Sequence, residues 1–138
     1  MNAYLDSSVL LRIVLGQRDR LKEWRTVQVG VASALVEVEC LRTLDRLRLA
    51  DGIAAEEIAR RRETVYQILE SLTLVELTRS VLARAAQPLP VVLGTLDALH
   101  LATALLWREQ TGEDLFLATH DTALGLAARS VGFRVLGL

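Results

Sequence analysis

The sequence has few of the residues that mark disulfide scaffolds, zinc clusters or exported proteins. Cys40 is the only cysteine among 138 residues, which excludes an internal disulfide and a multi-cysteine zinc site. One free thiol suits a reducing compartment, and no basic segment precedes the first apolar residues, so we expect a cytoplasmic protein. Glycine-rich phosphate loops and a G-x-S-x-G nucleophile elbow are also missing, which argues against nucleotide-binding and serine-hydrolase chemistry.

The chain has no large excess of charge of either sign. Its formal net charge is −1, from 16 basic and 17 acidic residues, and Lys22 is the only lysine. Taken alone, this balance argues against a nucleic-acid ligand, because proteins that bind phosphate backbones usually carry net positive charge. No linker, repeat or charged tail divides the chain, and 51% hydrophobic content predicts one domain over residues 1–138.

A long apolar stretch lies between Arg84 and Arg108, and Asp97 is its only charged residue. Pro88 and Pro90 interrupt the first half of this stretch, and an unpaired carboxylate is costly in the middle of a bilayer. We therefore expect buried core around a required acid, and no association with a membrane.

Apolar periodicity predicts short strands that alternate with helices. The expected strands cover residues 3–5, 27–31, 74–77, 115–118 and 134–136. The expected helices cover residues 9–15, from a cap at Ser33 to about 48, 54–72, from a cap at Thr78 to about 86, 97–110 and 121–131. This alternation predicts an α/β fold, a three-layer α/β/α sandwich around a mainly parallel sheet of four to five strands.

Acidic residues follow several of the expected strands. They are Asp6 after the first strand, Glu37 or Glu39 after the second, Asp97 at the start of the apolar helix, and Asp121 beyond the fourth strand. Ligands of parallel sheets collect at the carboxyl ends of the strands, so these acids are expected to converge. Crowded carboxylates raise one another's pKa, and a divalent cation relieves the repulsion. Oxygen-only ligands favour Mg²⁺ or Mn²⁺ over zinc, whereas each aspartate taken singly suits a helix cap.

Glu37 and Glu39 differ by about 200° around a helix, so only one of them can face such a cluster. The other is expected to be solvated. Apolar periodicity does not decide between them, because this helix has leucine on several faces.

Four segments of the chain together resemble the motifs of the PIN-domain ribonucleases, and within them the VapC-type toxins of bacterial toxin–antitoxin pairs. These segments are Tyr4 to Leu10, Ser33 to Glu39, Leu96 to Ala104, and Thr119 to Asp121 with Gly132 beyond. The second motif is a serine followed six residues later by an acid, which selects Glu39. The resemblance covers nearly the whole chain and implies a parallel sheet between helices.

The resemblance also implies metal-dependent hydrolysis of RNA phosphodiester bonds. Asp6 and Asp97 would be the principal Mg²⁺ or Mn²⁺ ligands, and Glu39 and Asp121 would complete the shell directly or through water. Ser8 and Thr119 would hydrogen-bond the carboxylates or the water, or else cap local turns. The implied partners are RNA, a cognate VapB-type antitoxin and a second copy of the chain in a homodimer or a larger assembly.

Several further residues have candidate roles at such a site. Those that follow the first catalytic strand and suit an RNA backbone are Arg12, Arg18, Arg20, Lys22 and Arg25. Trp24 suits either base stacking or a protein interface. We expect His100 to be a buried core histidine and His120 an exposed loop residue.

The charge balance has a different meaning once the four expected metal ligands are set aside. They leave 16 basic against 13 acidic residues, so the net charge of −1 does not exclude RNA. A catalytically silent PIN-fold module that binds protein or RNA stays an alternative, although the presence of all four acids argues against it.

Overall fold

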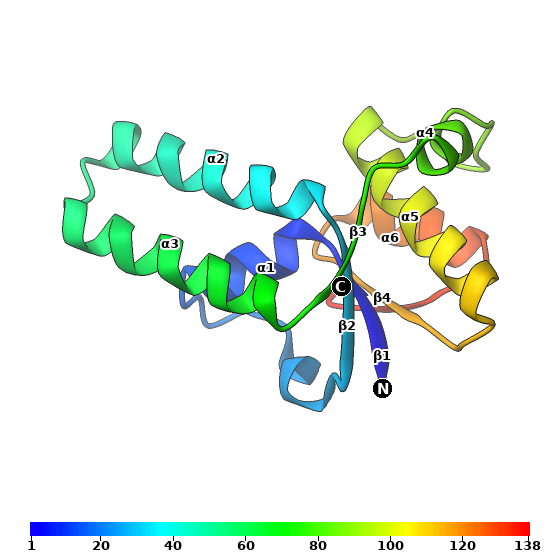
Figure 1. Cartoon of the computed structure of the whole chain (residues 1–138), viewed down its shortest axis with the longest axis horizontal. Coiled ribbons are helices and arrows are strands. Elements are labelled where there is room, and N and C mark those ends of the chain that lie inside the picture. Colours follow the sequence, from blue (N-terminus) through cyan, green and yellow to red (C-terminus); the bar gives the residue numbers. More distant parts are fainter.

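The computed structural model describes residues 1–138, and a five-stranded parallel sheet forms its centre (Figure 1). The strands are β1 (Asn2–Leu5), β2 (Val29–Ser33), β3 (Thr73–Val75), β4 (Phe116–Ala118) and β5 (Arg134–Leu136). They lie in the order β3-β2-β1-β4-β5, and every neighbouring pair is parallel. The predicted parallel sheet is therefore confirmed.

Helices cover both faces of this sheet. They are α1 (Ser7–Val14), α2 (Leu35–Asp51), α3 (Ala55–Glu70), α4 (Arg79–Ala85), α5 (Thr95–Thr111) and α6 (Thr122–Ser130), with a short 3-10 helix η1 (Lys22–Thr26). Figure 1 shows α1, α2 and α3 on one face and α4, α5 and α6 on the other, with α2 and α3 extending from the sheet as a hairpin. This is the predicted three-layer α/β/α sandwich. No helix has the length and apolar character that a membrane span requires.

Alternating side chains of the strands divide the core into two clusters. Leu5 and Ala118 pack with α1, α2 and α3, whereas their neighbours Tyr4 and Leu117 pack with α5 and α6. All four side chains are fully buried. Successive residues of a strand point to opposite faces, so short strands buried on both faces show continuous apolar runs.

The strand order places a topological switch at the centre of the sheet. The chain runs outward from β1 through β2 to β3, then returns to place β4 on the other side of β1. Ligands of open α/β sheets bind beyond the carboxyl ends of the strands at such a switch. The residues that follow β1 and β4 therefore lie where a site is expected.

Some predicted boundaries were wrong. The second strand begins at Val29, two residues late, because Val27 hydrogen-bonds back to Trp24 at the end of η1 and pairing with β1 starts at Asn2. The third strand ends at Val75, two residues early. Helix α5 begins at Thr95 with Gly94 as its N-cap, so Asp97 is the third helical residue and caps nothing.

Two predicted turn signals were confirmed. The Thr78 side chain accepts a hydrogen bond from the Val81 amide and caps α4. Gly112 ends α5 with φ at +68°, a backbone conformation that glycine adopts without strain. The Ser33 hydroxyl accepts from the amide of Leu35, the first residue of α2, although Ala34 occupies the N-cap position itself.

Candidate active site

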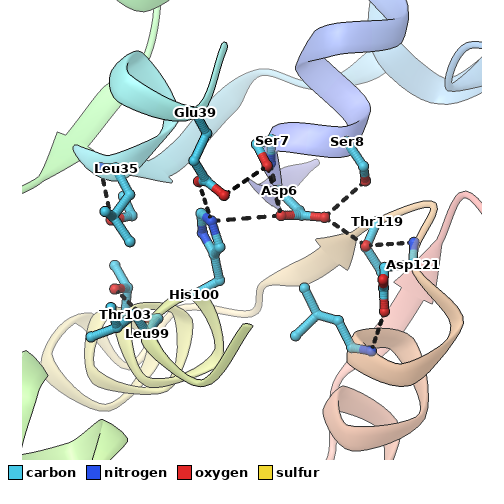
Figure 2. Close-up of polar contacts among 12 residues, drawn as sticks. Asp6, Ser7, Ser8, Leu35, Glu39, Leu99, His100, Thr103, Thr119 and Asp121 are labelled. Atoms are coloured by element: carbon cyan, nitrogen blue, oxygen red, sulfur yellow. Dashed lines mark hydrogen bonds and ion pairs between the residues drawn. The ribbon is translucent and has the colours of Figure 1, made fainter. Parts of the chain in front are cut away.

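Asp6 lies at the centre of a hydrogen-bond network between the ends of β1 and β4 (Figure 2). It caps α1, and its Oδ1 accepts a 2.8 Å hydrogen bond from the Ser7 amide. Its Oδ2 accepts 2.8 Å bonds from the hydroxyls of Ser8 and Thr119. The residue is only 4% exposed. A buried carboxylate held by three short bonds has one defined rotamer, as a metal ligand or catalytic base requires.

Thr119 combines the two roles that the sequence left open. Its hydroxyl donates to Asp6 and accepts from the Asp121 amide at 3.0 Å, so it both orients the carboxylate and closes the local turn. Ser8 likewise donates to Asp6 and accepts from the His120 amide at 3.0 Å. These hydroxyls join the β1 end to the β4 end across 112 or more residues of sequence.

Glu39 projects from the beginning of α2 toward the same network. Its Oε2 accepts from the Ser7 hydroxyl at 3.2 Å, and its Oε1 lies 2.6 Å from Nε2 of His100. Glu37 is exposed. Of the two glutamates that the sequence offered, the structure therefore brings Glu39 to Asp6 and leaves Glu37 in solvent.

His100 connects the acids in a way that the sequence did not predict. Its side chain is fully buried, as expected for a core histidine, and its Nδ1 lies 2.7 Å from the Tyr4 hydroxyl. Its Nε2 contacts Glu39 and lies 3.7 Å from Oδ1 of Asp6. The only sequence signal for this role was its position one helical turn after Asp97.

Burial by itself would lower the pKa of His100. The hydrogen bond with Glu39 and the negative charges of Asp6, Glu39 and Asp97 outweigh that effect, so the pKa is raised. The raised pKa favours an imidazolium between two carboxylates. No lysine or arginine forms an ion pair with any of the four acids, so His100 is their only basic contact.

Asp97 is half-buried in the first turn of α5, and no protein group hydrogen-bonds its side chain. Burial raises its pKa, and the negative charges of Asp121 and Asp6 raise it further, despite the opposing effect of His100. The structure therefore places Asp97 within electrostatic reach of the other acids. Its carboxylate oxygens are free to bind a ligand.

Asp121 is an exposed N-cap, as its position at a helix start predicted. Its Oδ1 accepts a 2.9 Å hydrogen bond from the Leu124 amide in the first turn of α6. The second oxygen has no protein partner. Capping therefore accounts for one oxygen of this carboxylate, and the negative charge of Asp121 contributes to the raised pKa of Asp97.

The donor chemistry of these four residues fits a hard divalent cation. Carboxylate oxygens are the ligands that Mg²⁺ and Mn²⁺ prefer. Burial is the main cause of the raised pKa of Asp97, and the negative charges of Asp121 and Asp6 add a repulsion that a cation would relieve. As the side chains stand, no three acidic, histidine or cysteine groups are close enough to share one ion. Cation binding would therefore draw the side chains together.

Two other candidates do not join the acids. Arg12 is held by Asp19, whose Oδ2 lies 3.0 Å from the Arg12 guanidinium. Cys40 is buried one residue after Glu39, and burial, together with the charges of Glu39 and Asp6, raises the pKa of its thiol to about 12. A protonated, buried thiol is a poor metal ligand.

Residues 3–129 match the PIN domain family. The chain belongs to the PIN-domain family. It is 36% identical to Ribonuclease VapC46 of Mycobacterium tuberculosis over 137 residues, 96% of this chain and 95% of that protein. It is 31% identical to Ribonuclease VapC47 of the same species over 133 residues, 94% and 92% of the two chains. These full-length relatives place it with the VapC-type PIN proteins of toxin–antitoxin systems.

A solved structure of a toxin–antitoxin complex from Klebsiella pneumoniae shares the fold. The TM-score is 0.71 at 17% sequence identity, over 99% of this PIN chain and 98% of that chain. The family resemblance drawn from the four motifs is thus confirmed. The metal-binding and catalytic roles of the four acids stay predictions.

Proposed function

We propose that this VapC-type PIN protein is a metal-dependent endoribonuclease toxin that hydrolyses RNA phosphodiester bonds. The observation that carries the proposal is the gathering of Asp6, Glu39 and Asp97 around one sheet edge without a lysine or arginine partner. Two full-length relatives are named ribonucleases, which supports the same chemistry. Hydrolysis of RNA would take place in the cytoplasm, where a buried free thiol such as that of Cys40 is stable.

Asp6 and Asp97 would hold Mg²⁺ or Mn²⁺, and Glu39 and Asp121 would complete the shell directly or through water. The bound cation would polarise a phosphate oxygen and lower the pKa of a water molecule for in-line attack. The protein contributes orientation: Ser8 and Thr119 fix the Asp6 carboxylate through its Oδ2. His100 in turn holds Glu39 against the same edge of the sheet.

We infer an antitoxin partner of the VapB type and a homodimer from family membership. The structural neighbour from Klebsiella pneumoniae is a toxin–antitoxin complex, which supports the first inference. An apolar groove between α4 and α5 supports the presence of a protein interface. It is lined by Leu82, Ala85, Ala86, Leu93, Thr95, Ala98 and Leu99.

Melting experiments with added Mg²⁺ or Mn²⁺ test the proposed metal site. A cation that binds only the folded protein stabilises it by mass action, about 2.7 kcal/mol at a hundredfold excess over Kd. We expect the wild-type melting temperature to rise with metal, and Asp97→Asn to lose most of that rise. Without metal, Asp97→Asn should melt above wild type, because the raised pKa means that the ionised carboxylate opposes folding near neutral pH.

Asp51→Asn is the matched control, because it makes the same chemical change at the exposed end of α2. Its metal response should equal that of wild type. A wild-type protein that metal does not stabilise would favour the catalytically silent module. An unchanged metal response in Asp97→Asn would remove Asp97 from the site.

A further inference from the structure

The segment between α1 and β2 carries a concentration of unpaired positive charge. Arg18, Arg20, Lys22 and Arg25 are all exposed, and none of them forms an ion pair. Of the two acids in the same segment, Asp19 is already neutralised by its bond to the Arg12 guanidinium. Four cations in eight residues, with one free acid, form the kind of patch that attracts a phosphate backbone.

These residues line a cavity that also has an apolar wall. The cavity has a volume of about 600 Å³ and is bordered by all four cations together with Ile13, Leu21 and Trp24. Leu21 is buried and anchors the segment, whereas Trp24 is half-buried and leaves part of its ring at the cavity. Cations beside an accessible aromatic ring are the usual means of holding single-stranded nucleic acid, through phosphate contacts and base stacking.

A second hollow lies beside this cavity and shares part of its lining. Arg20, Leu21 and Lys22 line both hollows, and the second is also bordered by Asp19, Glu23, His120, Gly137 and Leu138. The His120 amide donates to the Ser8 hydroxyl, which donates to Asp6. The second hollow therefore borders the residues that hold Asp6, whereas the segment ends at Thr26 beside Met1, at the start of β1.

His120 borders the second hollow and has one polar atom without a hydrogen-bond partner. Its Nδ1 lies 2.7 Å from the carbonyl oxygen of Gly137, and because a carbonyl only accepts, Nδ1 must carry the proton. The other nitrogen, Nε2, is buried and has no hydrogen-bond partner. In the neutral ring Nε2 is an acceptor, so the group that it lacks is a donor. A ribose 2′-hydroxyl is such a donor, and DNA does not have one. Because Nε2 is buried, the hydroxyl reaches it only when the side chains that cover this atom move on binding.

Gly137 is required for this arrangement. Its φ is +96°, and a Cβ at this position would lie 2.6 Å from the Thr119 carbonyl oxygen. Glycine therefore lets the chain after β5 approach β4 closely enough to hold His120.

We propose that the segment from Arg18 to Arg25, with Trp24 as a stacking platform and His120 as a contact to ribose, binds the single-stranded RNA that flanks the scissile phosphate. The inference rests on the proposed ribonuclease function and assigns the substrate path of the same site. Arg12, which is paired with Asp19, shapes the segment and does not contact RNA.

Binding of a fluorescent single-stranded RNA, measured by anisotropy in a chelator so that no cleavage occurs, tests the proposal. The double variant Arg20→Gln and Lys22→Gln should weaken binding. It should also reduce the slope of log K against log salt by about 1.4, since each phosphate contact to a single strand contributes about 0.7. Trp24→Leu keeps an apolar side chain against the core and should weaken binding at least about fivefold through lost stacking.

The matched control is the double variant Arg62→Gln and Arg79→Gln, which removes two exposed cations from α3 and α4, outside both hollows. Its affinity and salt slope should stay near those of wild type. Equal losses in the two double variants would overturn the proposal in favour of a general effect of net charge. Unchanged RNA binding in the Arg20 and Lys22 variant, with loss of antitoxin binding, would assign the segment to the protein partner and also overturn it.

A DNA strand of the same sequence tests the contact to ribose. Wild type should prefer RNA, and His120→Ala should reduce the ratio of RNA to DNA affinity, whereas an unchanged ratio would overturn the role of His120.

Failure of the proposed ribonuclease function and failure of the proposed RNA path give different results. Wild type that binds RNA through this segment but cleaves none with metal would refute the ribonuclease. Wild type that cleaves while the variants bind normally would refute the RNA path.

Discussion

Asp6→Asn is expected to reduce RNA cleavage by about a thousandfold or more. Metal-ion catalysis contributes several kcal/mol, and each 1.4 kcal/mol is a factor of ten in rate. The amide removes the negative charge from the most buried of the four acids, which is 4% exposed. It also replaces one acceptor oxygen by a donor, opposite either the Ser7 amide or the hydroxyls of Ser8 and Thr119.

Initial rates on a single-stranded RNA with saturating Mg²⁺ or Mn²⁺ measure this effect. Asparagine is a good helix N-cap, so α1 should persist, and the melting curve checks that the variant is folded. Asp51→Asn should cleave at the wild-type rate. A folded Asp6→Asn protein that keeps more than a tenth of the activity would contradict the assignment of Asp6 as a principal ligand.

The sequence predicted the layers of the fold because the strands are short and mostly apolar and alternate with helical segments. Strands such as β1 and β4 are buried on both faces, so their continuous apolar runs distinguish them from the amphipathic helices. The order of the strands in the sheet could not be predicted in this way. Apolar periodicity is a local property, whereas the pairing of β1 with β4 joins residues more than 110 positions apart.

The acids that follow strands could be predicted from the sequence, whereas the contacts between distant helices could not. Asp6 and Asp121 stood out because each follows a strand, and converging strand ends bring such residues together. The contact between His100 and Glu39 joins two helices across 61 positions, and nothing in either helix alone specifies it. Because Gly94 is the cap, Asp97 lies three positions inside the capping site, and its carboxylate is free.

Helix geometry and apolar periodicity could not decide between Glu37 and Glu39. Helix geometry required that only one of them face the acids, but leucines on several faces of α2 left the direction open. The family motif selected Glu39, and the structure places that side chain beside His100 and Ser7. The structure therefore gives the position of the Glu39 side chain, and the chemical role of its charge requires a variant that removes the charge and keeps the hydrogen bonds.

Glu39→Gln is such a variant and should lower cleavage by about a hundredfold. The amide oxygen can still accept from His100, and the Ser7 hydroxyl can turn from donating to accepting, so both hydrogen bonds of Glu39 survive. What is lost is one negative charge beside Asp6 and His100, and with it part of the affinity for a divalent cation and one of the causes that raise the pKa of His100. Cleavage rates at increasing Mg²⁺ or Mn²⁺ should show the loss as a raised metal requirement.

Glu37→Gln makes the identical change two residues away on the solvent side of the same helix. It should leave the cleavage rate and the metal requirement within about twofold of wild type, because surface charges far from the reacting groups have small effects. The pair therefore separates a local effect at the acids from a general effect of net charge or of α2 stability. Equal losses in both variants would show that the charge of α2 as a whole matters. A Glu39→Gln protein as active as wild type would leave Asp6, Asp97 and Asp121 as the complete ligand set.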